Sequence, residues 1–213
     1  MSHTLHRRGT SESLKNDYVI FAMSAKGINE VDSKVKLKRF LEIVSSFNPV
    51  NLGDMRTGNS FIRSKEVIVN STQDTSIVHG VFDNRETLIK AMQAIKEADL
   101  GISVIVSGLL DDVDSCCKEA GLNRHTCETS LGIWGKTERL PDEDVLRFST
   151  MCGHGQVPFN LVIKMIEDIK AGRRTAREAA EELSKPCQCG VFNPVRAEEM
   201  LEEILCLWGV TVA

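Results

Sequence analysis

The order of strand-like and helix-like patterns in the first half of the chain constrains its fold most strongly. Short runs rich in β-branched and aromatic residues predict strands, and apolar residues at helical spacing predict helices. Strands are expected over 18–23, 77–82 and 102–106, and residues 60–62 and 67–69 are expected to form one bulged strand or two short ones. Helices are expected over 35–47 and 88–98. This strand–helix–strand–strand–helix–strand order is typical of the ferredoxin-like split βαβ arrangement, with both helices on one face of an antiparallel sheet.

The second half of the chain has a different pattern. Helical signals dominate after residue 141, including Thr175 with Glu178 at capping-box spacing and Asn193 followed by a proline. We therefore expect an α+β protein: an N-terminal arm over 1–16, a ferredoxin-like α+β domain over 17–108, and a smaller, mainly helical segment over 109–213 that carries a cysteine site.

Composition excludes several classes of function. The net charge is −4, from 26 basic and 30 acidic residues that are interspersed, which argues against a general nucleic-acid or membrane binder. No stretch approaches the roughly 20 apolar residues of a membrane span, and the first residues lack the apolar region of a secretory signal. The expected location is therefore the cytoplasm, where seven cysteines are better suited to metal binding or catalysis than to disulfides.

Three cysteines stand beside glycines near expected helix starts. Cys152 lies in the segment 151–155, and Cys187 and Cys189 lie in the segment 186–190. A helix N-terminus stabilises a thiolate through its free N–H groups and its dipole. Because the helices between the two segments can pair antiparallel across a short turn, we expect the three thiols to converge.

The fourth ligand decides which metal the predicted site would hold. Adding Cys127 to Cys152, Cys187 and Cys189 gives four thiolates, the ligand set of a [4Fe–4S] cluster and our first prediction. Adding His154 instead gives a Cys₃His set that suits zinc. The first hypothesis is an iron–sulfur or metal-binding cytoplasmic protein in redox, lyase or sulfur and electron delivery chemistry of anaerobic metabolism. Another is a non-catalytic accessory protein with a structural zinc.

A local resemblance supports an alternative without a metal. The five residues Met-Cys-Gly-His-Gly at 151–155 resemble the segment that carries one of the two catalytic cysteines in the proline racemase family. The resemblance implies that Cys152 is an acid/base or nucleophile, with His154 or Cys187 as its partner.

Three arginines are candidate anion-binding residues. Arg7 and Arg8 are adjacent in the arm, and Arg56 lies in a polar loop between two expected strands. Guanidinium groups bind carboxylates and phosphates through paired hydrogen bonds. A small anionic substrate or a redox partner protein is therefore the expected partner. The sequence leaves the oligomeric state open.

Overall fold

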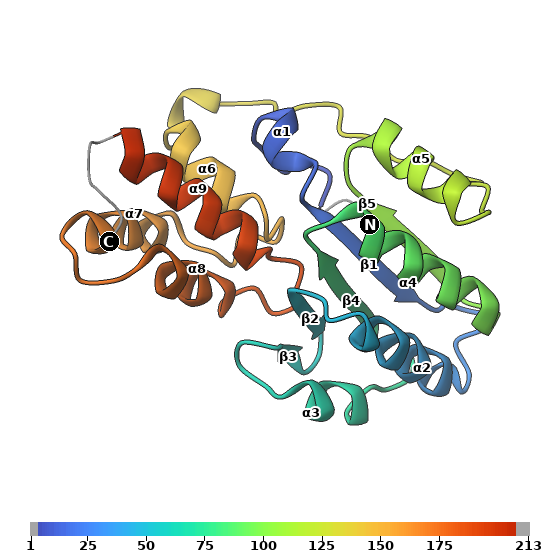
Figure 1. Ribbon diagram of the computed structural model, residues 1–213. Helices are drawn as coiled ribbons and strands as arrows, with labels where there is room; N and C mark the ends of the chain where they lie inside the picture. Colours follow the sequence, from blue (N-terminus) through green and yellow to red (C-terminus); the bar gives the residue numbers. More distant parts are fainter. Residues whose placement is uncertain (1–3, 208–213) are drawn as a thin grey trace.

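The computed structural model describes residues 4–207 and has an α+β architecture (Figure 1). Its sheet has five antiparallel strands in the order β3-β2-β4-β1-β5. The strands are β1 (Tyr18–Met23), β2 (Asn51–Asp54), β3 (Gly58–Asn59), β4 (Ile77–Phe82) and β5 (Ser103–Ser107). The helices of the first half are α1 (Ser11–Leu14), α2 (Ser33–Ser46), α3 (Lys65–Asn70), α4 (Arg85–Ala98) and α5 (Leu110–Glu119).

The central strands are buried on both faces, and alternate residues enter two different cores. Ile20 and its even-numbered neighbours in β1 pack against α2 and α4, and Cys116 of α5 joins this first core. Val19 and Phe21 of β1, with Val81 of β4, point the other way and join a second core. The sheet therefore connects two layers of helices.

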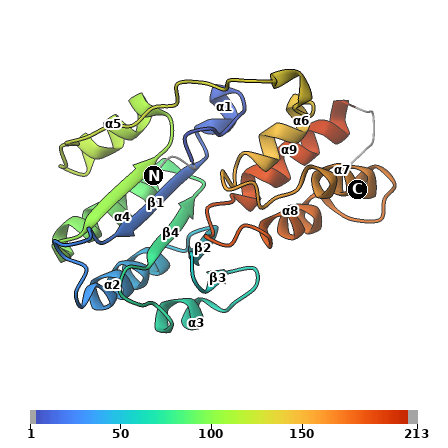
Figure 2. The same ribbon diagram turned by 180° about the vertical axis from the view of Figure 1, so that it is seen from behind.

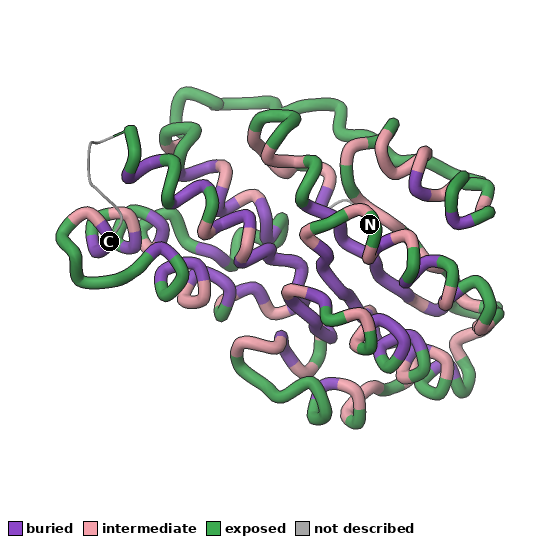
Figure 3. The backbone as a smooth tube through the Cα atoms, in the orientation of Figure 1, coloured by how far each residue is buried: buried purple, intermediate pink, exposed green. Residues whose placement is uncertain are grey.

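The second core is built mainly by the C-terminal helices. These are α6 (Glu143–Ser149), α7 (Phe159–Lys170), α8 (Ala176–Ser184) and α9 (Pro194–Leu207), and a short 3₁₀ helix, η1 (Thr137–Arg139), precedes them. Figure 3 shows that their buried stretches face inward, toward one another and the sheet. The three cysteines at 152, 187 and 189 belong to this core.

The N-terminal arm connects the two halves. Both views place α1 between α5 and the C-terminal pair α6 and α9 (Figures 1 and 2). Within residues 4–207, no helix combines the length and the apolar character that crossing a bilayer requires.

Two local predictions from the sequence were wrong. Residues 67–69 form part of the helix α3 rather than a strand, because the Ser64 side chain accepts a hydrogen bond from the Val67 N–H and caps a helical turn. Only Ile68 of that helix is buried, and residues 60–62 form turns rather than a strand. The strand β2 was missed because it has only four residues and three of them are polar or glycine, although all four are buried.

Candidate functional site: a buried thiol cluster

The cysteine loops follow helices rather than precede them. Cys152 lies in the turn after α6, and its N–H donates to the Ser149 carbonyl. Cys187 lies just after α8, and its N–H donates to the Ser184 carbonyl. The prediction that these thiols stand at helix starts was therefore wrong, and the dipole at a helix C-terminus does not favour a thiolate there.

The predicted convergence of the two cysteine segments is present in the structure. The Sγ atoms of Cys187 and Cys189 are 3.9 Å apart, and the Sγ of Cys189 is 3.7 Å from Nδ1 of His154. The side chains of Cys152 and Cys187 also lie close enough to shift each other's pKa. All three cysteines are fully buried in the second core, whereas His154 is an exposed residue at the edge of the cluster.

The three thiols have different acidities because they share hydrogen bonds. The hydrogen bond with Cys187 and then burial raise the pKa of Cys152 far above its ordinary value. For Cys187, the Cys152 bond lowers the pKa, but the Cys189 bond and burial outweigh it and raise the pKa to about 12. The hydrogen bond from Cys187 lowers the pKa of Cys189 against the effect of burial. Cys189 is thus the first of the three to lose its proton.

The donor types of the cluster, three thiols and one imidazole, are those of a Cys₃His zinc site. Zinc binds cysteine sulfur at about 2.3 Å, so two sulfurs on one tetrahedral ion lie roughly 3.8 Å apart. The observed 3.9 Å between Cys187 and Cys189 is close to that spacing. As placed, no group of three or more His, Cys, Asp or Glu side chains within residues 4–207 could hold a metal ion. Cys152 and His154, at the ends of the chain of contacts, would have to turn inward to close the set.

Asparagines from the sheet hold the loop that carries Cys187 and Cys189. The side-chain amide of Asn59 donates to the carbonyls of Ser184 at 3.0 Å and Cys187 at 2.7 Å. The side-chain amide of Asn51 donates to the Phe192 carbonyl at 2.9 Å. Both asparagines are fully buried, so these bonds fix the loop where water does not compete.

A glutamine joins the two cysteine loops to each other. Oε1 of Gln156 accepts a hydrogen bond from the Gln188 N–H at 3.1 Å. The same oxygen lies 3.8 Å from Sγ of Cys152. One side chain in the first loop therefore contacts both a cysteine of its own loop and the residue between the two cysteines of the second.

Glycine at position 53 allows strand β2 to lie against the loop that carries Cys187 and Cys189. A Cβ at Gly53 would overlap the carbonyl oxygen of Cys189 and would lie 2.6 Å from its carbonyl carbon and 2.8 Å from Cα of Gly190. These are backbone atoms, which cannot move aside alone. Because Gly53 has no side chain, the Cys189 peptide can lie against β2.

Gly53→Ala should therefore destabilise the protein by about 1–3 kcal/mol through overpacking. Gly108→Ala is a matched control, because a Cβ there would meet only side-chain atoms, Cγ2 of Val113 at 3.0 Å and Cδ1 of Tyr18 at 3.1 Å. Urea unfolding of both variants measures the difference. Equal stability of the two would show that the Cys189 loop is not pressed against β2.

The predicted anion-binding arginines are occupied by internal contacts. Arg7 pairs with the carboxylate of Asp17 and donates to two backbone carbonyls, and its side chain is 6% exposed. Arg8 pairs with Glu143 and is part-exposed. Arg56 donates to side-chain oxygens in the loop that precedes β4. The structure brings Arg7 to the cysteine loops but does not bring Arg56 there.

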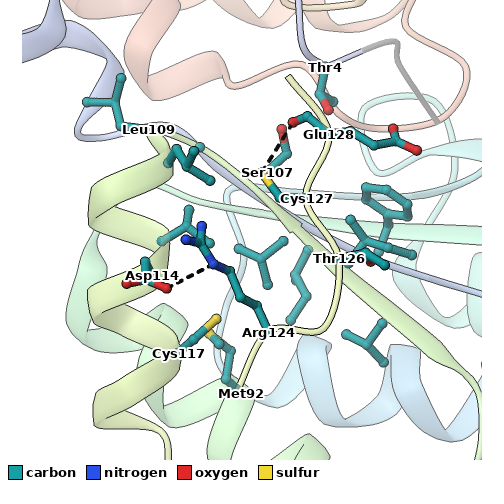
Figure 4. Close-up of a pocket in the computed structure, with 18 of the residues that line it drawn as sticks. Thr4, Met92, Ser107, Leu109, Asp114, Cys117, Arg124, Thr126, Cys127 and Glu128 are labelled. Atoms are coloured by element: carbon teal, nitrogen blue, oxygen red, sulfur yellow. Dashed lines mark hydrogen bonds and ion pairs between the residues drawn. The ribbon is translucent and has the colours of Figure 1, made fainter. Parts of the chain in front are cut away.

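Cys127 lies in a different part of the molecule. It is exposed in the segment that follows α5, and Figure 4 shows it beside Ser107 of β5. With His125, it lines a pocket of about 720 Å³. Cys189 contacts β2 instead, and β4 and β1 separate β2 from β5, a distance of roughly 14 Å at ordinary strand spacing. The structure therefore does not place Cys127 with the other three predicted ligands.

The remaining cysteines are also away from the site. Cys116 is buried in the first core, Cys117 is half-buried beside it, and Cys206 is exposed on α9. Four residues that contact the cysteine loops were not predicted from the sequence, namely Asn51, Gly53, Asn59 and Gln156.

Comparison of the whole chain with protein-family models, with curated proteins and with solved structures found no match in any of the three.

Proposed function

We propose that this chain is a metal-binding protein whose centre holds zinc through Cys152, Cys187, Cys189 and His154. The observation that carries the proposal is the contact of three buried cysteines with one another and with the exposed His154, at 3.9 Å from Cys187 to Cys189 and 3.7 Å from Cys189 to His154. Free buried cysteines usually stand among apolar side chains, whereas here they contact each other and a histidine. Cys₃His is an established ligand set of structural zinc sites.

The spacing of the sulfurs favours one metal ion over a [4Fe–4S] cluster. Each thiolate of such a cluster binds a different iron, so the ligand sulfurs lie farther apart than those that share one ion. The short Cys187–Cys189 separation and the distant position of Cys127 both support the mononuclear alternative. Cys127 as a fourth thiolate would require its segment to cross from β5 to the cysteine loops.

A structural role for the zinc is favoured over catalysis. Catalytic zinc sites keep one position open for water or substrate, whereas four protein ligands close the site. All three cysteines are fully buried, and the raised pKa of Cys152 opposes its use as a free nucleophile or base. The zinc would fasten the loop after α6 to the loop after α8, and so hold the C-terminal helices together.

Three further inferences concern the fold around this centre, the compartment of the protein and its partner. We infer a ferredoxin-like arrangement for residues 17–108, because α2 joins β1 to β2, α4 joins β4 to β5, and one antiparallel strand separates each pair. We also infer a reducing compartment such as the cytoplasm, because neighbouring thiols must stay reduced to bind metal. A protein partner suits an accessory role better than a small anionic substrate, since Arg7 and Arg8 already pair with carboxylates.

Metal analysis of the purified protein and two variants tests the proposal. The wild type should hold one zinc per chain, and Cys127→Ser should hold the same amount. His154→Ala should bind zinc more weakly by a factor of ten or more, because a three-ligand site fills its fourth position with water. Zinc that is lost from Cys127→Ser and kept in His154→Ala would overturn this ligand set.

A further inference from the structure

The pocket of about 720 Å³ beside β5 is large enough for a small organic molecule (Figure 4). Its walls are β5, the helices α4 and α5, and the segment 122–130 that follows α5, and the N-terminal arm also contributes. Pockets of about 300–1,000 Å³ bury most of such a ligand. β5 is an outer strand of the sheet, and β4 and β1 separate it from β2, against which the Cys189 loop lies. The pocket is therefore a second candidate site, away from the thiol cluster.

The wall that β5 and α5 form is apolar and incompletely covered. Four aliphatic side chains line the pocket there and border the first core, namely Val104, Val106, Val113 and Leu122. All four are only part-buried, whereas the central strand β1 is buried from Tyr18 to Ala22. Each methylene that leaves water for such a surface strengthens binding about fourfold. This wall favours a ligand with an apolar body.

Two cationic side chains also line the pocket. Arg124 reaches from the segment 122–130 toward α5, where its Nε lies 3.1 Å from Oδ1 of Asp114 (Figure 4). Lys96 of α4 donates from its Nζ to the Gly121 carbonyl at 2.8 Å. Because a carbonyl carries no net charge, this bond leaves the charge of Lys96 unneutralised. A ligand with an anionic group therefore finds two cations in the pocket.

The ion pair of Arg124 can open without leaving its carboxylate alone. Oδ2 of Asp114 also pairs with Lys118 at 2.7 Å, so this carboxylate has two cationic partners. Arg124 is 44% exposed and Lys118 is 70% exposed, and exposed pairs contribute little to stability. A ligand carboxylate can take the Arg124 guanidinium through paired hydrogen bonds while Asp114 keeps Lys118. Glu128, which would repel an anion, lies beside Thr4 at the other end of the pocket (Figure 4).

We propose that this pocket binds an amphipathic monocarboxylate, a fatty-acid-like molecule. Its apolar body lies against β5 and α5, and its carboxylate pairs with Arg124 and Lys96. A cationic molecule of the same length would meet two like charges, so the pocket selects by charge as well as by shape. The inference does not depend on the proposed zinc centre, and metal analysis does not test it.

Calorimetric titration of the wild type with three probes is the first test. Decanoate, kept below its micelle-forming concentration, should bind about tenfold more tightly than octanoate, because it has two more methylenes. Decyltrimethylammonium has the same chain and the opposite charge, so it should bind at least about tenfold more weakly than decanoate. No binding of decanoate, or equal binding of decanoate and the cation, would overturn the proposal.

Arg124→Met tests the contact with the carboxylate, and Lys118→Met is its matched control. Each variant removes one cationic partner of Asp114, but of the two side chains only Arg124 lines the pocket in the described part of the chain. Arg124→Met should weaken decanoate binding about 10- to 100-fold, the usual effect of losing a charged hydrogen bond. It should also narrow the preference for decanoate over decyltrimethylammonium, which a collapsed pocket would not do selectively. Lys118→Met should bind both probes as the wild type does, and equal losses in the two variants would refute the role of Arg124.

Thiol alkylation of the wild type locates the ligand without any variant. Cys127 is exposed and lines the pocket, whereas Cys206 is exposed on α9. Decanoate at ten times its Kd should slow the reaction of Cys127 with iodoacetamide about tenfold, because only the ligand-free fraction reacts. The rate at Cys206 should not change. Equal rates at Cys127 with and without decanoate would show that the ligand does not occupy this pocket.

Discussion

Replacing Cys189 with serine should abolish zinc binding. Cys189 has the central position in the cluster, because its sulfur contacts both Cys187 and His154. Its pKa is lowered where those of Cys152 and Cys187 are raised, so it supplies the first thiolate to an incoming ion. A serine hydroxyl at neutral pH offers zinc no anionic ligand. Metal content measured by mass spectrometry after dialysis should fall from one zinc per chain to near zero.

Cys206→Ser provides the control for this prediction. Cys206 is exposed on α9 and belongs to neither buried core, so its replacement removes a thiol without touching the site. The Cys206→Ser protein should keep the metal content of the wild type. Equal zinc in the two serine variants, whether full or absent, would refute the assignment of Cys189 as a ligand.

Replacing Asp17 with asparagine should have the largest effect on folding stability. Asp17 is the shared carboxylate of Arg7 and Arg196, and the variant would leave two buried guanidiniums without a counter-charge. Breaking a buried ion pair by removing one partner commonly costs about 3–5 kcal/mol. We expect a loss of this size in the free energy of unfolding, measured by urea titration of the metal-free protein so that zinc does not contribute.

Glu143→Gln is the comparison for Asp17→Asn. Glu143 also pairs with an arginine of the arm, but its side chain is 56% exposed. Exposed pairs contribute roughly 0–1 kcal/mol, so the variant should unfold close to the wild type. If Asp17→Asn unfolded at the same urea concentration as Glu143→Gln, the pairing of Asp17 with Arg7 and Arg196 would not stabilise the fold more than an exposed ion pair does.

The sequence predicted regular elements well where periodicity was strong. The helix expected over 35–47 is α2 (Ser33–Ser46), and the strands expected over 18–23 and 77–82 have the same bounds in the structure. The sequence predicted secondary structure poorly where polar residues are buried. The strand β2 contains Asn51 and Gly53, which contact residues more than 100 positions away, namely Phe192 for Asn51 and Cys189 for Gly53. Local propensity carries no information about such partners.

Part of the candidate site was also predictable. Glycine-flanked cysteines and a short turn between helices indicated the convergence of Cys152 with Cys187 and Cys189, which the structure contains. The reason given for their acidity was wrong, because Cys152 and Cys187 follow helices and their shared hydrogen bonds set the order of the pKa values. The contact of Arg7 with both loops joins residues 144 and 184 positions apart, and no spacing rule anticipates it.

The central claim is that three sulfurs and one imidazole surround a single zinc ion. X-ray absorption at the zinc edge of the purified wild-type protein tests it most directly, since the fine structure reports the kind and number of ligand atoms. The expected spectrum has three sulfurs at about 2.3 Å and one nitrogen at about 2.0–2.1 Å from the metal. A protein that binds no zinc, or a spectrum with only oxygen and nitrogen neighbours, would contradict it.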